Sequence, residues 1–191
     1  SIFMAEVAST FNEALLFDHT LKRTTDRRER MSLLGHYLEH VKATVFRQTQ
    51  FAEFELRIHE AVERGEALTG DSLDALYLRL AREYYGHEAG VCTVDDYVRS
   101  EWAYIPHFYY NFYVFQYATS FCASSAIGER VLGGDTGAVE RYMELLSAGG
   151  SDYPIELLKR VGVDMGTTEP VETAVRKMDG IMDEMELLLG E

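Results

Sequence analysis

The sequence has few cysteines, and this limits the kind of protein that it can encode. Only Cys92 and Cys122 occur among the 191 residues, and they form no C-x-x-C pair. A small secreted domain that depends on disulfides normally contains more cysteines. We therefore expect a protein of a reducing compartment, with a cytoplasmic location.

Basic residues are also scarce. The chain carries 18 lysines and arginines against 32 aspartates and glutamates, a formal net charge of -14. Such a surface repels nucleic-acid phosphates and anionic lipid head groups. No apolar run is long enough to cross a bilayer. We therefore expect neither nucleic acid nor a membrane as a partner.

Proline is rare too, and nearly every segment shows helical periodicity without the alternation typical of strands. The three prolines, Pro106, Pro154 and Pro170, fall where helices would begin or end. With 47% hydrophobic residues the chain can bury one core, and it contains no internal repeat or linker. The prediction is an all-α, multi-helix body that forms a single domain over residues 1–191.

Capping residues and glycines set the expected helix limits. Thr24-Thr25-Asp26 should start a long second helix that Gly65 ends, and Thr69 should cap the third. The expected helices cover about residues 2–21, 26–64, 70–85, 110–131, 136–147 and 154–161, and a last one opens near Thr168 and Pro170.

The first expected helix has one polar face on an otherwise apolar segment. Glu6, Ser9, Thr10 and Glu13 lie three, four and seven positions apart, a spacing that aligns side chains on a helix. A carboxylate beside apolar neighbours needs a cation or metal as its partner. The alternative is an ordinary solvated or ion-paired helix face.

A second notable segment, residues 97–121, is unusually rich in aromatic residues. His107 follows Pro106 there, and Tyr110, Tyr113 and Tyr117 come after it. Taken singly, each tyrosine is more typical of a packed core, and His107 could equally cap a helix.

Three blocks of the sequence resemble one known family. They are A-E-V-A-S-T-x-N-E at residues 5–13, T-V-F-R-Q-T with F-A-E-F-E at residues 44–55, and I-P-H-F-Y-Y-N-F-Y-V-F-Q-Y-A at residues 105–118. In this order they resemble oligoendopeptidase F, of the thimet oligopeptidase-like zinc metallopeptidases. The resemblance extends from the first residues to about residue 120.

This resemblance implies a zinc peptidase that cleaves short peptides. In the family, two histidines of an H-E-x-x-H helix and a glutamate of the next helix bind zinc, and Glu6 matches that glutamate. The resemblance assigns Asn12 and Glu13 to orienting the metal ligands. No H-E-x-x-H occurs in the 191 residues. We therefore expect the C-terminal part of a catalytic domain, inactive without the upstream part of the same polypeptide.

The family also suggests a role for the aromatic segment. Peptide hydrolysis develops negative charge on the former carbonyl oxygen, which fixed neutral hydrogen-bond donors stabilise. The resemblance assigns this role to His107 with Tyr110, Tyr113 and Tyr117, placed on one helix, and Tyr113 is the first choice among the phenols.

Two other interpretations remain open. His36-x-x-Glu39-His40 reads as an inverted zinc motif, in which both histidines and a later glutamate would bind metal and Glu39 would act as base. Alternatively, the chain is a non-catalytic helical module that binds a peptide or protein. A truncated catalytic domain would also expose an apolar seam, so self-association is a further expectation.

Overall fold

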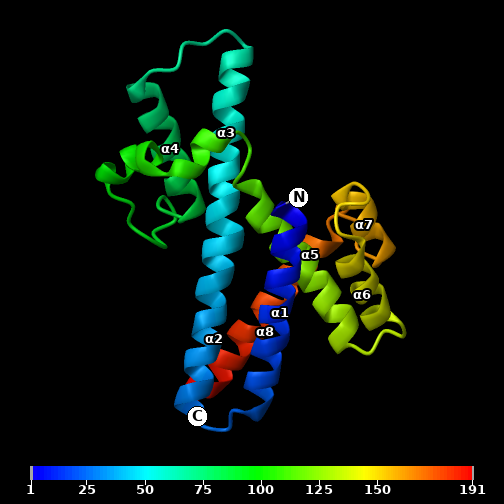
Figure 1. Cartoon of the computed structure of the whole chain (residues 1–191). Coiled ribbons are helices and arrows are strands. Elements are labelled where there is room, and N and C mark those ends of the chain that lie inside the picture. The colour runs from blue at the N-terminus through cyan, green and yellow to red at the C-terminus, as the bar shows by residue number, and fades with distance from the viewer. Residues whose placement is uncertain (1, 191) are drawn as a thin grey trace. The chain divides into compact units, whose positions relative to one another are not determined.

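The computed structural model describes residues 2–190, with side chains from residue 3, and this part of the chain contains helices and turns but no strand. The all-α prediction is confirmed. The α-helices are α1 (Ile2–Arg23), α2 (Arg27–Val41), α3 (Arg47–Glu63), α4 (Gly70–Tyr84), α5 (Phe115–Leu132), α6 (Ala138–Ala148), α7 (Pro154–Arg160) and α8 (Glu169–Gly190) (Figure 1). A π-helical segment, η1 (Lys42–Phe46), and two 3₁₀ helices, η2 (Asp96–Tyr104) and η3 (Pro106–Tyr110), complete the elements.

The helices belong to two compact units. The first contains the chain up to Val45 together with Gln116 onwards, and the second contains Phe46–Phe115. That the two units fold as the single domain expected from the sequence stays a prediction.

In the first unit, α1 and α2 form an antiparallel pair (Figure 1). The turn between them ends at Asp26, whose carboxylate accepts hydrogen bonds from the backbone N–H groups of Arg28 and Glu29, as an N-cap does. Helix α8 packs on α2, and their shared core includes Leu34, Val41 and Ile181.

A second core of the same unit lies along the other side of α1. Val7 and Phe11 of α1 pack with Ala123 and Ile127 of α5, and Leu157 of α7 joins them. Val7 is fully buried, so the α1 turn that carries Glu6 is anchored on this core.

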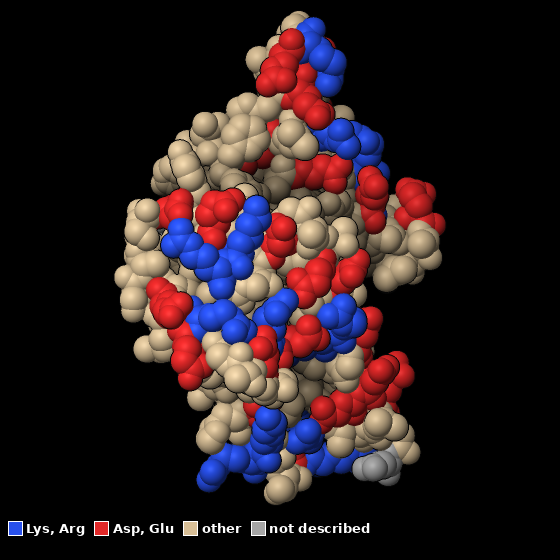
Figure 2. Space-filling view, turned by 90° about the vertical axis from the view of Figure 1, so that its right-hand side faces the viewer, with Lys and Arg blue, Asp and Glu red and all other residues tan. Residues whose placement is uncertain are grey.

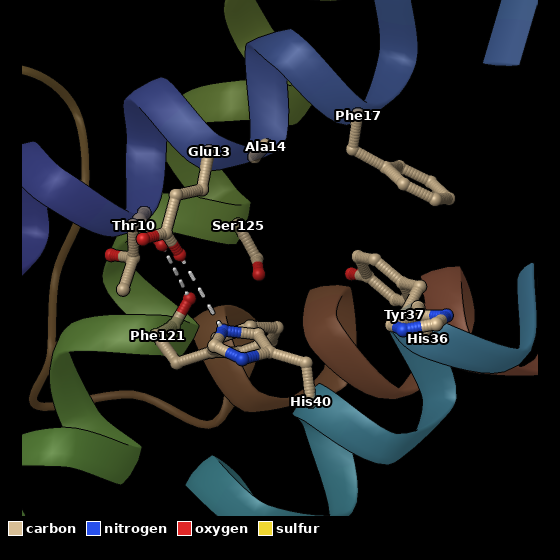
Figure 3. Close-up of a pocket in the computed structure, with 10 residues that line it drawn as sticks. Thr10, Glu13, Ala14, Phe17, His36, Tyr37, His40, Phe121 and Ser125 are labelled. Atoms are coloured by element: carbon tan, nitrogen blue, oxygen red, sulfur yellow. Dashed lines mark hydrogen bonds and ion pairs between the residues drawn. The ribbon is translucent and has the colours of Figure 1, made fainter. Parts of the chain in front are cut away.

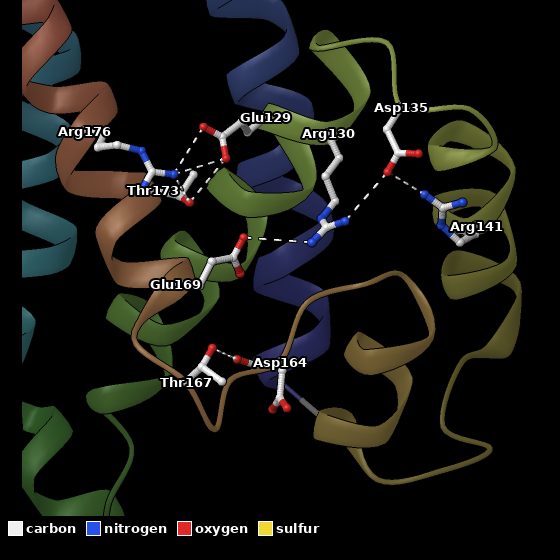
Figure 4. A network of polar contacts seen from close by, with 9 residues as sticks. All are labelled: Glu129, Arg130, Asp135, Arg141, Asp164, Thr167, Glu169, Thr173 and Arg176. Atoms are coloured by element: carbon white, nitrogen blue, oxygen red, sulfur yellow. Dashed lines mark hydrogen bonds and ion pairs between the residues drawn. The ribbon is translucent and has the colours of Figure 1, made fainter.

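An arginine organises the C-terminal end of α5 (Figure 4). Arg130 lies 3.7 Å from Asp135 and 3.9 Å from Glu169, and Asp135 also pairs with Arg141 at 2.8 Å. Gly162 has φ +85°, and a Cβ at this position would approach the guanidinium of Arg130 to 3.1 Å. Only glycine meets both requirements without strain.

The second unit is built on α3 and α4. Gly65 ends the α3 segment with φ +79°, and the N–H of Glu66 bonds to the carbonyl of Ala61, as in a left-handed C-cap. Thr69 and Ser72 then form a capping box at the start of α4. The core of this unit contains Phe51, Phe54, Tyr77, Leu80, Val94, Ile105 and Val114.

Two helix predictions were wrong in detail. The expected long second helix is interrupted by the π-helical segment Lys42–Phe46, which periodicity does not reveal. The helix expected from about Tyr110 begins only at Phe115, because Asn111 and Phe112 have φ +50° and +53° and cannot continue a right-handed helix. Tyr110 and Tyr113 therefore do not lie on the same helix as Tyr117.

The charged surface fits the sequence composition. Acidic and basic side chains are interleaved over most of the face shown in Figure 2, and basic side chains gather at its lower end. None of the described helices has the length and apolar character needed to span a membrane.

Candidate functional site

In the second unit, three of the four residues proposed for oxyanion stabilisation meet. The ring of Tyr113 stacks on His107 with centroids 5.6 Å apart and an interplanar angle of 26°. The ring of Tyr110 meets Tyr113 edge to face at 5.9 Å. Tyr113 thus contacts both other rings, which places one imidazole and two phenols in a single cluster.

A left-handed turn creates this cluster. His107 and Tyr110 belong to the short helix η3, and the two residues that follow, Asn111 and Phe112, both have positive φ. Positive φ is tolerated by asparagine but is unfavourable for a bulky residue such as phenylalanine. The turn directs the chain so that Tyr113 returns to His107.

Two residues of α3 hold the strained turn. Glu55 is only 1% exposed, and its carboxylate accepts a hydrogen bond from the backbone N–H of Phe112. The imidazole of His59, one turn later, packs against the Phe112 ring in a tilted arrangement, with the ring centroids 4.4 Å apart. Strained backbone persists where the surroundings fix it, and here a buried acid and an aromatic contact do so.

Sequence analysis missed Glu55 and His59, although one signal was available. Glu55 falls on the face of α3 that carries Phe51 and Phe54, both buried in the core. A carboxylate on an apolar face needs a specific donor, so its position alone indicated an internal partner.

A second acid links three elements of the same unit. Glu101 of η2 accepts a hydrogen bond of 2.5 Å from the Tyr77 hydroxyl of α4 and another from the Arg47 guanidinium of α3. Burial, and then the bond to Glu101, raise the pKa of Tyr77 far above its usual value. Tyr77 therefore stays protonated and acts as a donor.

The remaining candidates, Glu6, Asn12, Glu13 and Tyr117, belong to the first unit. Glu6 is half-buried, and among the described residues its carboxylate has no hydrogen bond or ion pair. The hydroxyls of Ser9 and Thr10 bond to its backbone carbonyl at 3.1 and 2.6 Å instead. Ser9 and Thr10 of the predicted polar face are thus engaged by the backbone of α1, whereas the Glu6 carboxylate remains available for a ligand.

Glu13 and Asn12 have partners within the chain. The carboxylate of Glu13 lies 3.8 Å from Nε2 of His40, across a pocket of about 170 Å³ lined by α1, α2 and α5 (Figure 3). Asn12 donates to the carbonyl of Ala8 at 2.9 Å. Tyr37 lines the same pocket, and its hydroxyl is buried without a hydrogen-bond partner among the described residues.

The inverted motif does not assemble a metal site in the described part of the chain. Nδ1 of His36 lies 3.0 Å from the carbonyl of Ser32, His40 faces Glu13, and Glu39 is exposed. In residues 2–190, no group of three or more histidine, cysteine or acidic side chains is placed to hold a metal ion. His36, Glu39 and His40 are thus surface residues of α2, the ordinary interpretation of the motif.

Comparison with known proteins shows strong similarity along the whole chain. The family model described as peptidase family M3 matches residues 1–177. Oligopeptidase PepF of Bacillus subtilis (strain 168) is 47% identical over 189 residues, and group B oligopeptidase PepB of Streptococcus agalactiae serotype III (strain NEM316) is 45% identical over 193. The crystal structure of oligoendopeptidase-F from Enterococcus faecium is 44% identical and superposes with a TM-score of 0.92.

The similarity covers only part of those proteins. The alignments include 99% and 100% of this chain, but 28% of the B. subtilis relative and 31% of the S. agalactiae relative. The crystal structure matches 100% of this chain over 36% of its own chain.

Proposed function

This chain belongs to peptidase family M3, and we propose that it forms part of the catalytic domain of a zinc-dependent oligoendopeptidase. The proposed reaction is hydrolysis of an internal amide bond in a short peptide, in the cytoplasm. The chain would supply one metal ligand and the groups that stabilise the developing oxyanion. It would act together with the upstream part of the same polypeptide.

The cluster of His107, Tyr113 and Tyr110 carries this proposal. A peptide carbonyl oxygen gains negative charge as water attacks, and donors that are already oriented lower the barrier without reorganising. Two contacts fix the orientation of these donors. The rings of His107 and Tyr113 stack, and Glu55 accepts a hydrogen bond from Phe112 in the turn between them. In the proposal, the Tyr113 hydroxyl donates to the oxyanion, with His107 and Tyr110 as neighbouring donors and Tyr117 as a fourth.

Glu6 has the properties expected of one ligand in a shared metal site. A catalytic zinc needs three protein ligands and an open position. The half-buried carboxylate of Glu6, which has no partner among the described residues, would supply one. The other two would be histidines of the upstream polypeptide. Zinc bound there would lower the pKa of a water molecule and polarise the peptide carbonyl. Asn12 and Glu13 would help to orient the histidine ligands.

The expected partners are a peptide substrate and the upstream part of the polypeptide. Self-association through surface that the upstream part would cover stays a prediction, which sedimentation of the purified chain would check. The two free cysteines, exposed Cys92 and buried Cys122, agree with a reducing compartment.

A chimera tests the proposed function. Residues 1–191 would replace the matching segment of the B. subtilis relative, with an internally quenched peptide as substrate and zinc content measured by mass spectrometry. We expect a chelator-sensitive peptidase in which Glu6→Gln removes both activity and bound zinc. His107→Ala should lower activity but leave the zinc content unchanged.

Glu63→Gln is the matched control. This carboxylate is exposed at the end of α3, and it is distant in sequence from both Glu6 and His107. Full activity and zinc content after Glu6→Gln would refute the metal assignment. A chimera that binds the peptide without cleaving it would instead favour the non-catalytic binding module.

A further inference from the structure

The second unit contains a pocket that the proposed chemistry does not use. Its volume is about 570 Å³, and its walls come from α3, α4, η2 and the loop that precedes η2. Pockets that bind small ligands are typically roughly 300–1,000 Å³ and combine apolar walls with a few convergent polar groups. This pocket has both the volume and the mixed lining of a binding site.

A buried glutamine on the α3 wall has one side-chain atom that finds no partner in the described part of the chain. Gln50 is 2% exposed, and its Oε1 is buried without a hydrogen-bond partner among the described residues. Buried polar atoms are nearly always paired in native proteins. Gln50 also lines the pocket, so a turn of its side chain would present this unpaired oxygen to a ligand that carries N–H donors.

The unmatched charge of the pocket is negative. Glu101 is already neutralised by Arg47, whose guanidinium also lies over the Phe51 ring at 4.9 Å. Asp95 lines the pocket as well, and in the described chain its exposed carboxylate takes part in no hydrogen bond or ion pair. With Arg47 and Glu101 paired, the remaining charge favours a cation.

Two tyrosines provide flat surfaces at the same site. Tyr97 is 80% exposed and Tyr104 is 74% exposed, and both line the pocket. Exposed aromatic faces attract cations, and a guanidinium can also stack on them.

We propose that this pocket binds the guanidinium of an arginine side chain carried by a peptide. The group is planar, positively charged and has five N–H donors, so its chemistry matches the amide oxygen of Gln50, the carboxylate of Asp95 and the faces of the tyrosines that line the pocket. An ammonium group has three donors and no planar face, so lysine should bind more weakly. That the arginine belongs to a peptide substrate rests on the proposed function, whereas recognition of the guanidinium does not.

Titration of the 191-residue chain with N-acetyl-arginine amide, followed by ¹H–¹⁵N NMR, tests the proposal. The reference ligand is N-acetyl-citrulline amide, which has nearly the same shape without the charge. We expect saturable shifts at the pocket residues and binding about tenfold weaker for citrulline. Equal affinity for the two ligands, or no binding of the arginine ligand, would overturn the proposal.

Two matched variants locate the site. Asp95→Asn should weaken binding about threefold, as expected for an exposed ion pair. Asp96→Asn removes the same charge from the adjacent residue, which pairs with Arg82 and does not line the pocket, and should leave affinity unchanged. Equal weakening by both variants would show a general effect of charge and refute the site.

Gln50→Leu should weaken binding by about tenfold, because the ligand would lose a buried hydrogen bond. Circular dichroism would check that this variant folds. If Gln50→Leu does not fold, the surface variant Asp95→Asn alone tests whether the ligand binds at this pocket.

The single exposed cysteine offers an independent measurement. Cys92 lines the pocket and Cys122 is buried, so alkylation by iodoacetamide should report mainly on Cys92. The arginine ligand should slow alkylation of Cys92, and Asp95→Asn should reduce this protection. Unchanged alkylation at saturating ligand would contradict the proposed location.

Neither measurement uses peptide hydrolysis. An inactive chimera would therefore leave the binding result intact, and failure of the arginine ligand to bind would leave the proposed peptidase chemistry intact.

Discussion

The buried carboxylate of Glu55 accepts a hydrogen bond from the backbone N–H of Phe112, 57 residues later in the chain. This contact joins α3 to the left-handed turn that separates His107 from Tyr113. The geometry of the aromatic cluster therefore depends on an acid that takes no part in the proposed chemistry.

Replacement of this acid should destabilise the second unit. Glu55→Gln keeps the shape but replaces a charged acceptor with a neutral one, and hydrogen bonds to charged groups contribute about 1.5–3 kcal/mol. We expect the free energy of unfolding to fall by up to this amount in urea denaturation. Glu63→Gln, at an exposed position of the same helix, should leave it unchanged. Equal stability of the two variants would show that the Phe112 contact contributes nothing.

Removal of one hydroxyl should separate packing from chemistry. Tyr113→Phe retains the ring that contacts His107 and Tyr110, so the far-UV circular dichroism spectrum should stay that of the folded chain. The proposed oxyanion donor is lost, and kcat of the chimera should fall about 10²–10³-fold with little change in KM. Tyr109→Phe is the control, because that hydroxyl bonds to the carbonyl of Ala103. A Tyr113→Phe enzyme with normal kcat would exclude this residue as the donor.

Asp74 should make stability depend on pH. The Trp102 indole and the Ser100 hydroxyl donate to its carboxylate at 2.7 and 2.8 Å, and these bonds lower its pKa below the ordinary value. A lowered folded-state pKa gives stability that is present above the unfolded-state pKa of about 3.9 and is lost as pH falls through the folded value.

Unfolding free energies measured between pH 2 and pH 5 would test this linkage. We expect the slope with pH to be smaller in Asp74→Asn than in the unmodified chain. The two slopes should become equal above about pH 5, where Asp74 of the unmodified chain is ionised in both the folded and the unfolded state. Identical slopes would show that the two hydrogen bonds do not affect titration. Asp71→Asn, an exposed position in the first turn of the same helix, provides the control for loss of charge.

The prediction of a single domain has a direct spectroscopic test. Trp102 is the only tryptophan and belongs to the second unit, so its fluorescence reports on that unit, whereas far-UV circular dichroism reports on all helices. One cooperative domain should give coincident thermal transitions by the two methods. Two separated transitions would show that the units unfold independently.

Much of the helical framework was accessible from the sequence because it depends on local chemistry. The Thr69 N-cap and the Gly65 C-cap formed as predicted, and α2 begins directly after the predicted turn at Thr24-Thr25-Asp26. Each of these signals acts within a few residues of its own position. The π-helical segment and the positive φ of Phe112 were not predictable in this way. Tertiary contacts select such conformations against the local preference of the residues.

The sequence by itself determined the helical class, most helix limits and membership in the family. Periodicity, capping residues and ordered motifs depend only on the order and spacing of residues along the chain. Only the tertiary structure decided that Tyr113 returns to His107, that Glu55 holds the turn, and that Gln50 and Asp95 line one pocket. These relationships join residues separated by up to 57 positions. They arise from the packing of helix faces, which the spacing of residues within a single helix does not specify.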